Sequence, residues 1–173
     1  TIPDVFSFRT VETPHGKFGY IRIWTFMVND DESFVDEFIR IAEMLPQNGL
    51  IIDLRANGGG LITAGERLLQ VLTPRTIEPC RLHFINSPLT QTLCEQVEWL
   101  GQYQDSIAQA VETGSAFSYG FPIKPAEEHN TLGQTYYGPV VLIVDALCYS
   151  TTDIFAAGFQ DHHIGKILGS SGN

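Results

Sequence analysis

Residues 49–60 read GLIIDLRANGGG, and this stretch decides how the rest of the sequence is interpreted. Residues 50–54 form a short, almost uninterrupted apolar run, which is typical of a strand buried on both faces of a sheet. Three glycines follow, and a helix is predicted over about residues 64–72. The stretch therefore predicts a strand, a glycine loop and a helix in direct succession.

A second stretch, residues 138–153, reads GPVVLIVDALCYSTTD and repeats this plan. Residues 140–144 are apolar throughout, and they lead through a tight loop into a helix predicted from about residue 151 to residue 160. A final strand is predicted over residues 164–168. Alternating strands and helices make an α/β domain with a largely parallel central sheet flanked by helices. Such sheets bind ligands at the carboxyl ends of their strands, where both loops lie.

The residues before the first stretch add a hairpin and a helix. Strand-forming residues over 5–11 and 18–24 flank the turn sequence TPHG, which predicts a β-hairpin. The helix predicted next ends before Pro46 and should cover the sheet. One of its faces carries four apolar residues at steps of four, three and four, namely Phe34, Phe38, Ile41 and Leu45.

The middle of the chain predicts an insertion. Residues 79–85 predict another strand, and residues 86–137 predict an inserted region of helix and loop. The chain then divides into residues 1–85, which include the glycine loop, the inserted residues 86–137, and residues 138–173, which carry the second strand–loop–helix unit and the final strand.

The composition excludes several classes of protein. The 173 residues include 10 Lys and Arg against 20 Asp and Glu, which gives a net charge of −10, and no basic cluster is present. Binding to nucleic acid or to anionic lipid is therefore not expected. No apolar run approaches the roughly 18 to 20 residues that span a bilayer. The 3 cysteines and 5 histidines lack metal-ligand spacing, so neither a disulfide framework nor a metal site is predicted.

Each loop is ambiguous when it is considered alone. The glycine loop matches neither a P-loop nor a dinucleotide fingerprint, and three glycines also make an ordinary tight turn. Ser150 lies between a buried strand and a helix, where a nucleophile is held near helix N–H groups. Serine is equally a favoured helix N-cap, and the local sequence favours that simpler interpretation.

Both loops together, with residues 160–161 and 166–169, resemble the C-terminal processing, or tail-specific, serine proteases in order and spacing. The resemblance covers most of the chain outside residues 86–137. Residues 150–153, STTD, are closer to the form found in tricorn-type relatives. The resemblance implies a crotonase/Clp-protease-like core built from ββα units and a serine endopeptidase that acts on polypeptides without a metal or organic cofactor.

The same resemblance implies roles for particular residues. Ser150 would be the nucleophile that forms an acyl-enzyme, and the backbone N–H groups of Gly60 and Thr151 would form the oxyanion hole. A supporting or substrate-binding role would fall to four further residues of the glycine loop, namely Arg55, Asn57, Gly58 and Gly59.

The general base is not identified within the sequence. One branch of the family uses a lysine beyond the final strand and the tricorn-type branch uses an upstream histidine, so we expect a fragment whose base lies outside it. Matching Lys166 to that lysine would break the register of the motif. Asp161 is 11 positions after Ser150, which places it roughly 16 Å along a straight helix. Helix capping or an ion pair is therefore the preferred interpretation of Asp161.

Two other functions share these features. A non-catalytic domain on the same fold would bind a hydrophobic ligand or a peptide. A crotonase-type acyl-CoA enzyme also uses backbone N–H groups for an oxyanion, but it would require a basic phosphate site that this acidic sequence does not offer. A positioned base near Ser150 distinguishes the protease from the binding domain.

Overall fold

Five strands form one mixed sheet in the computed structural model, which describes residues 4–170. The order β1-β2-β3-β4-β5 follows the sequence. The hairpin strands β1 (Phe6–Thr13) and β2 (Gly16–Ile23) are antiparallel. The strands β3 (Leu50–Asp53), β4 (Val140–Asp145) and β5 (Gly165–Ser170) continue the sheet in parallel with β2. The predicted α/β class with a mostly parallel sheet is confirmed.

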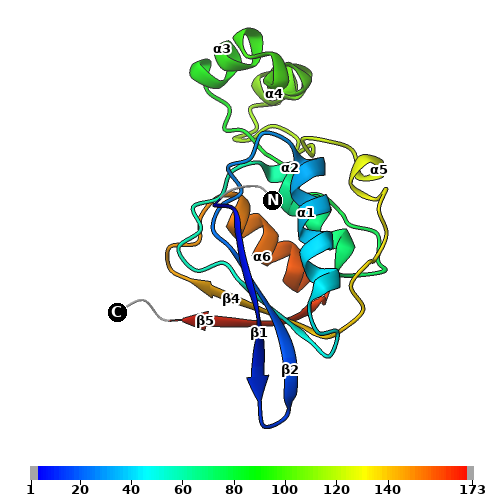
Figure 1. The fold of residues 1–173 in the computed structure, drawn as a ribbon. Helices are drawn as coiled ribbons and strands as arrows, with labels where there is room; N and C mark the ends of the chain where they lie inside the picture. The colour runs from blue at the N-terminus through cyan, green and yellow to red at the C-terminus, as the bar shows by residue number, and fades with distance from the viewer. Residues whose placement is uncertain (1–3, 171–173) are drawn as a thin grey trace. The chain divides into compact units, whose positions relative to one another are not determined.

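Three helices supply the apolar layer against this sheet (Figure 1): α1 (Asp31–Met44), α2 (Ile62–Val71) and α6 (Thr151–Asp161). Helix α1 begins after Asp30, whose carboxylate accepts the Ser33 N–H at 2.8 Å. The predicted apolar face of α1 is buried against the sheet. The core also contains Phe155 and Phe159 of α6.

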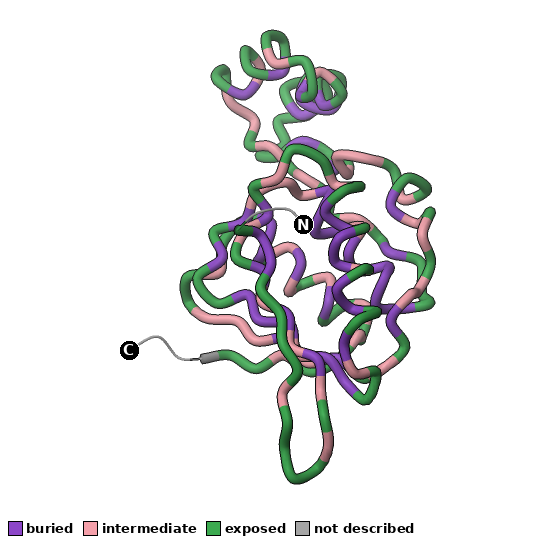
Figure 2. Tube along the Cα trace, in the orientation of Figure 1, coloured by how far each residue is buried: buried purple, intermediate pink, exposed green. Residues whose placement is uncertain are grey.

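The sheet has two different faces, because successive side chains of a strand point in opposite directions. On β2, Ile21 and Ile23 are fully buried in the core, whereas Tyr20 and Arg22 alternate with them and are half-buried. Figure 2 shows the buried segments gathered where the helices lie against the sheet, with the tip of the β1–β2 hairpin exposed. The burial predicted for residues 50–54 and 140–144 holds on the side of the helices, and on the opposite face Asp53 is fully buried but Ile51, Val141 and Ile143 are not. Within residues 4–170 that face is only partly covered, so Ile51 and Ile143 stay half-buried. We call it the open face.

The chain forms two compact units, and residues Cys80–Ile123 make the smaller one. It contains α3 (Pro88–Gln96), the 3-10 helix η1 (Glu98–Tyr103) and α4 (Gln104–Thr113), packed around Cys94, Leu100, Tyr103 and Ile107. The strand predicted over residues 79–85 is absent from the described chain. Two isolated bridges stand in its place, Leu82 with Phe121 and Ile85 with Phe117. The short helix α5 (Ala126–His129) belongs to the larger unit.

No helix among residues 4–170 is long and apolar enough to cross a membrane.

Candidate active site

Ser150 occupies a strained turn between β4 and α6. Its backbone has φ 57° and ψ −122°, a left-handed region that non-glycine residues rarely adopt. Its carbonyl accepts the N–H groups of Asp153 and Ile154, so the residue begins α6. Within residues 4–170 its hydroxyl makes no capping hydrogen bond, and the residue is exposed. The Ser150 side chain therefore does not cap the helix, and the N-cap interpretation is wrong. Holding a non-glycine residue in this backbone conformation costs about 1–3 kcal/mol.

The glycine loop presses directly against this turn. A Cβ on Gly59, which has φ 92°, would lie 2.6 Å from the Tyr149 carbonyl oxygen and 2.8 Å from Ser150 Cβ. A Cβ on Gly60, with φ 147°, would lie 2.0 Å from the carbonyl carbon of Phe26. Only glycine fits at these two positions. Gly58, in contrast, is exposed and has open space around its position.

The two predicted oxyanion donors come from neighbouring segments. The Thr151 hydroxyl donates to the Gly60 carbonyl at 2.7 Å, which ties the start of α6 to the glycine loop. Among residues 4–170, neither the Gly60 N–H nor the Thr151 N–H is used in a hydrogen bond. Two unused backbone donors beside a free hydroxyl are the components that an oxyanion site requires.

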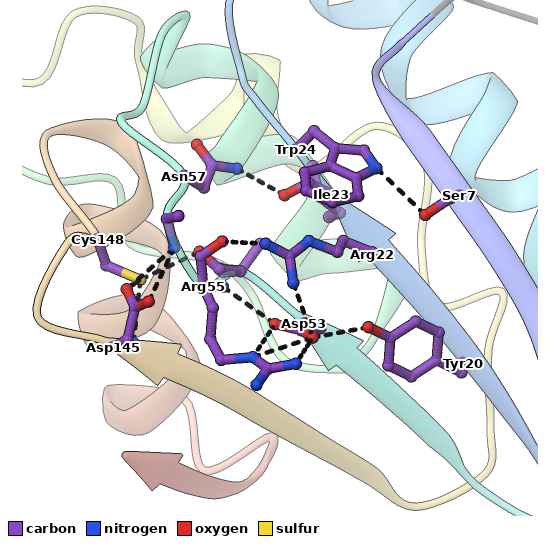
Figure 3. A network of polar contacts seen from close by, with 12 residues as sticks. Ser7, Tyr20, Arg22, Ile23, Trp24, Asp53, Arg55, Asn57, Asp145 and Cys148 are labelled. Carbon is purple, nitrogen blue, oxygen red and sulfur yellow. Dashed lines mark hydrogen bonds and ion pairs between the residues drawn. The ribbon is translucent and has the colours of Figure 1, made fainter. Parts of the chain in front are cut away.

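Asn57 connects three segments at this point. Its Nδ2 donates to the Ile23 carbonyl at 3.0 Å, as Figure 3 shows, while its Oδ1 accepts the Gly59 N–H at 2.9 Å and the Thr152 hydroxyl at 2.8 Å. Its own carbonyl accepts the Tyr149 N–H at 3.2 Å. Asn57 is fully buried. The side chain therefore holds β2, the glycine loop and the serine turn in one arrangement.

A second set of hydrogen bonds joins the glycine loop to the loop that follows β4 (Figure 3). The Asp145 carboxylate accepts the N–H groups of Ala56, at 3.0 Å, and of Leu147. The Ala56 hydrogen bond is the largest reason why the pKa of Asp145 lies below its ordinary value. The Cys148 thiol donates to the Leu54 carbonyl at 3.2 Å. The sequence interpretation missed Asp145, although its place after the second apolar strand mirrors that of Asp53 after the first.

Arg55 faces Asp53 on the open face of the sheet. Its guanidinium contacts the Asp53 carboxylate at 2.6 Å, and the Tyr20 hydroxyl donates to the same carboxylate at 2.7 Å. Burial alone would raise the pKa of Asp53, but the hydrogen bonds from Arg55 and Tyr20 and the charge of Arg22 outweigh it and lower the pKa to about 2. Arg55 and Asn57 both order the strand ends and the loop.

No side chain of residues 4–170 makes a hydrogen bond to the Ser150 hydroxyl. Lys166 is exposed on β5 in register with Val141, and Asp161 is exposed at the last residue of α6. His129 is fully buried beside Glu66, with His129 Nε2 3.3 Å from Glu66 Oε2, between α5 and α2. The described residues also hold no cluster of His, Cys, Asp and Glu that could bind a metal ion.

Comparison with known proteins gives a consistent result. The family model of peptidase family S41 matches residues 17–173. The chain is similar to mature CPAF, with 21% identity and a TM-score of 0.64, over 95% of this chain and 40% of that chain. It is similar to the photosystem II D1 C-terminal processing protease, with 19% identity and a TM-score of 0.54, over 96% of this chain and 36% of that chain. A lipoprotein from Streptococcus agalactiae shares 13% identity with a TM-score of 0.56, over 96% of this chain and 49% of that chain. The chain spans less than half of each of these structures, and the likeness to them concerns the fold.

Proposed function

The chain belongs to peptidase family S41, and from this premise we propose that it carries the nucleophile and oxyanion site of a serine endopeptidase. One observation carries the proposal. Ser150 is held at φ 57° with a hydroxyl that no residue in the described part of the chain hydrogen-bonds, and the glycine loop lies against its turn. Backbone strain of this kind is retained where the surrounding structure over-determines it, and such positions cluster at active sites. A serine on a strained strand-to-helix turn is also the geometry that exposes a nucleophile.

The proposed reaction proceeds through an acyl-enzyme. The Ser150 Oγ attacks the carbonyl carbon of a peptide bond while a general base takes its proton. The carbonyl oxygen becomes an oxyanion that accepts the N–H groups of Gly60 and Thr151. The C–N bond then breaks, and the proton passes to the leaving amine. Water, deprotonated by the same base, hydrolyses the resulting ester and restores Ser150.

The contribution of the proposed oxyanion site to kcat can be given a magnitude. Losing one preset donor of this kind costs roughly 2.7 to 4 kcal/mol in kcat, which is about 100- to 1,000-fold. Both donors are backbone N–H groups, so the Thr151 hydroxyl does not contact the oxyanion itself. The Thr151 hydroxyl instead keeps the two donors together through the Gly60 carbonyl.

We place the general base, a lysine or a histidine, beyond the described residues. The reason is the geometry around Ser150, where no Lys or His of residues 4–170 makes a hydrogen bond to the hydroxyl. The Asp53 and Asp145 carboxylates are both occupied by other donors, with their pKa values lowered. Neither is poised to accept a proton near neutral pH.

The non-catalytic binding domain is the less favoured function. A binding domain on this fold does not need a strained serine with a free hydroxyl, and it does not need two unused N–H groups beside it. The described residues also show no basic site of the kind that an acyl-CoA enzyme would use at this loop, since Arg55 is committed to Asp53.

Hydrolysis by the whole protein tests the proposal. Ser150→Ala is expected to abolish the cleavage of an unstructured protein such as casein, while Ser33→Ala, an exposed serine in the first turn of α1, leaves it unchanged. Retained cleavage by a folded Ser150→Ala protein would show that the reaction uses another nucleophile. Mass spectrometry of the products would show whether internal peptide bonds are cut, as an endopeptidase requires.

A further inference from the structure

The short helix α5 is attached to the larger unit by a histidine. It consists of a single turn, Ala126–His129, and a helix of this length has no stability of its own. Within Ala126–His129, His129 is the one buried residue, and its side chain is fully enclosed where α5 packs on α2 (Figure 1). The position of α5 therefore depends on a side chain that ordinarily changes its charge between pH 5 and 8.

Charged side chains face the His129 imidazole from each of the helices around it. They are Asp31 of α1, Glu66 and Arg67 of α2, Glu128 of α5, and Lys124 just before α5. The Asp31 carboxylate is paired with two cations, since Arg67 lies 3.1 Å away and Lys124 lies 3.5 Å away. Glu66 is the acidic residue that reaches the ring, with its Oε2 3.3 Å from His129 Nε2.

A protonated imidazole is poorly accommodated at this position. The neutral ring carries one N–H and the charged ring carries two. Within residues 4–170 neither ring nitrogen makes a hydrogen bond, and only Nε2 is directed at a carboxylate, that of Glu66. Protonation would therefore bury a charge and a second N–H without an acceptor. Burial first, and then the nearby charge of Lys124, lower the pKa of His129 below its ordinary value of 6.5.

The residues that follow α5 are attached by groups that keep their charge state over this pH range. Gln70 Oε1 accepts the Leu132 N–H at 2.7 Å, and the Val71 carbonyl accepts the Tyr136 N–H at 3.0 Å. Leu132 and Tyr136 also pack on the main core. The pH-sensitive attachment is therefore confined to the residues before Leu132. We call residues 124–130 the α5 segment.

The α5 segment also connects two parts of the chain that are distant in sequence. Asn130 Oδ1 accepts the Ile77 N–H at 2.7 Å, and Asn130 Nδ2 donates to the Ile77 carbonyl at 2.9 Å. Ile77 lies three residues before Cys80, where the smaller unit begins, and Lys124 directly follows Ile123, where that unit ends. Detaching the α5 segment would therefore remove the hydrogen bonds that join the two chain connections of the smaller unit.

We propose that the α5 segment detaches from α2 in acid, when His129 takes up a proton. In the detached segment the imidazole is solvated and has its ordinary pKa of 6.5, whereas in the attached segment its pKa is lower. The attached form is therefore most stable above pH 6.5, and it loses stability as the pH falls below 6.5. Linkage then makes the opening constant of the α5 segment about tenfold larger at pH 5.5 than at pH 7.5.

Hydrogen–deuterium exchange of the whole protein, measured by mass spectrometry of peptic peptides, tests this proposal. Dividing each measured exchange rate by the intrinsic rate at the same pH gives the opening constant of each peptide. For peptides within residues 124–130 we expect the tenfold increase from pH 7.5 to pH 5.5. Peptides of α6 and of residues 132–136 should show no comparable increase.

His129→Gln is expected to abolish this pH dependence, because an amide stays neutral throughout the range and keeps a donor for Glu66. His15→Gln is the matched control, since His15 is exposed in the turn of the hairpin, and it should retain the pH dependence of the unaltered protein. If His129→Gln does not fold, an NMR titration of the His129 imidazole in the unaltered protein replaces it. That titration should give a pKa below 6.5.

An opening constant of the α5 segment that stays the same from pH 7.5 to pH 5.5 would overturn the proposal. So would an equal increase in all peptides, which would indicate unfolding of the whole domain in acid. Unchanged pH dependence in folded His129→Gln, or a His129 pKa of 6.5 or above in the folded protein, would contradict it as well. None of these measurements uses catalysis, so the result is independent of the proposed role of Ser150.

Discussion

Replacing Asn57 with alanine should disconnect the glycine loop from the serine turn. The substitution leaves three groups without their partner, namely the Ile23 carbonyl, the Gly59 N–H and the Thr152 hydroxyl, and the residues that carry them are buried. An unsatisfied buried polar group costs about 1–3 kcal/mol. Water entering the space would recover part of that loss, so we expect about 3 kcal/mol of destabilisation in urea unfolding.

The matched control is Asn48→Ala. Asn48 is exposed and makes one long hydrogen bond, at 3.5 Å to the Lys17 carbonyl, so its loss should cost no more than about 0.5 kcal/mol. Thr152→Val provides a milder variant if Asn57→Ala does not fold. It removes one hydrogen bond, should cost about 1 kcal/mol, and should slow phosphonylation of Ser150. If Asn57→Ala is as mild as Asn48→Ala, Asn57 does not hold the loops together and the reasoning is wrong.

Other predictions concern the same structure. Gly60→Ala should abolish activity or folding, because its Cβ would overlap the Phe26 backbone. Gly58→Ala has open space around it among the described residues and should be tolerated. Thermal unfolding and an activity assay compare the two variants. Asp53 has a pKa of about 2 against an ordinary value of 3.8. Its carboxylate therefore adds about 2 kcal/mol to the free energy of unfolding above pH 3.8, and this contribution is lost as the pH falls to 2. Unfolding free energies across that range should show this loss, and Asp53→Asn should remove that part of the pH dependence. Ser150→Gly should relieve the backbone strain at φ 57°, whereas Ser150→Ala keeps it, and both variants lack the nucleophile. In denaturant unfolding the glycine variant should therefore be about 1 kcal/mol more stable than the alanine variant. Equal stability would mean that the turn is unstrained.

The secondary structure of the larger unit could be predicted because its signals are local. The apolar spacing on α1, the apolar runs of β3 and β4, and the turn residues of the hairpin each lie within one segment. The open face could not be predicted, since a run such as residues 50–54 looks the same whether one or both faces are covered. The strand predicted over residues 79–85 became two isolated bridges because its partners lie more than 30 residues away, at Phe117 and Phe121.

The candidate site was predictable in its residue types but not in its connections. Ser150 and the glycines could be found from the sequence with the help of the family resemblance. The hydrogen bond from Thr152 to Asn57 joins residues 95 positions apart, and the bond from Ala56 to Asp145 joins residues 89 positions apart. No spacing rule reveals such pairs. The left-handed backbone of Ser150 is likewise imposed by the packed glycine loop, since serine itself does not favour it.

The central claim is that Ser150 is an activated nucleophile. The most direct measurement is covalent labelling of the whole protein by a fluorophosphonate probe, with peptide mapping to locate the adduct. The account predicts one adduct on the peptide containing Ser150, lost in Ser150→Ala and retained in Ser33→Ala. A folded protein that gives no adduct, or gives one on another serine, would contradict the account.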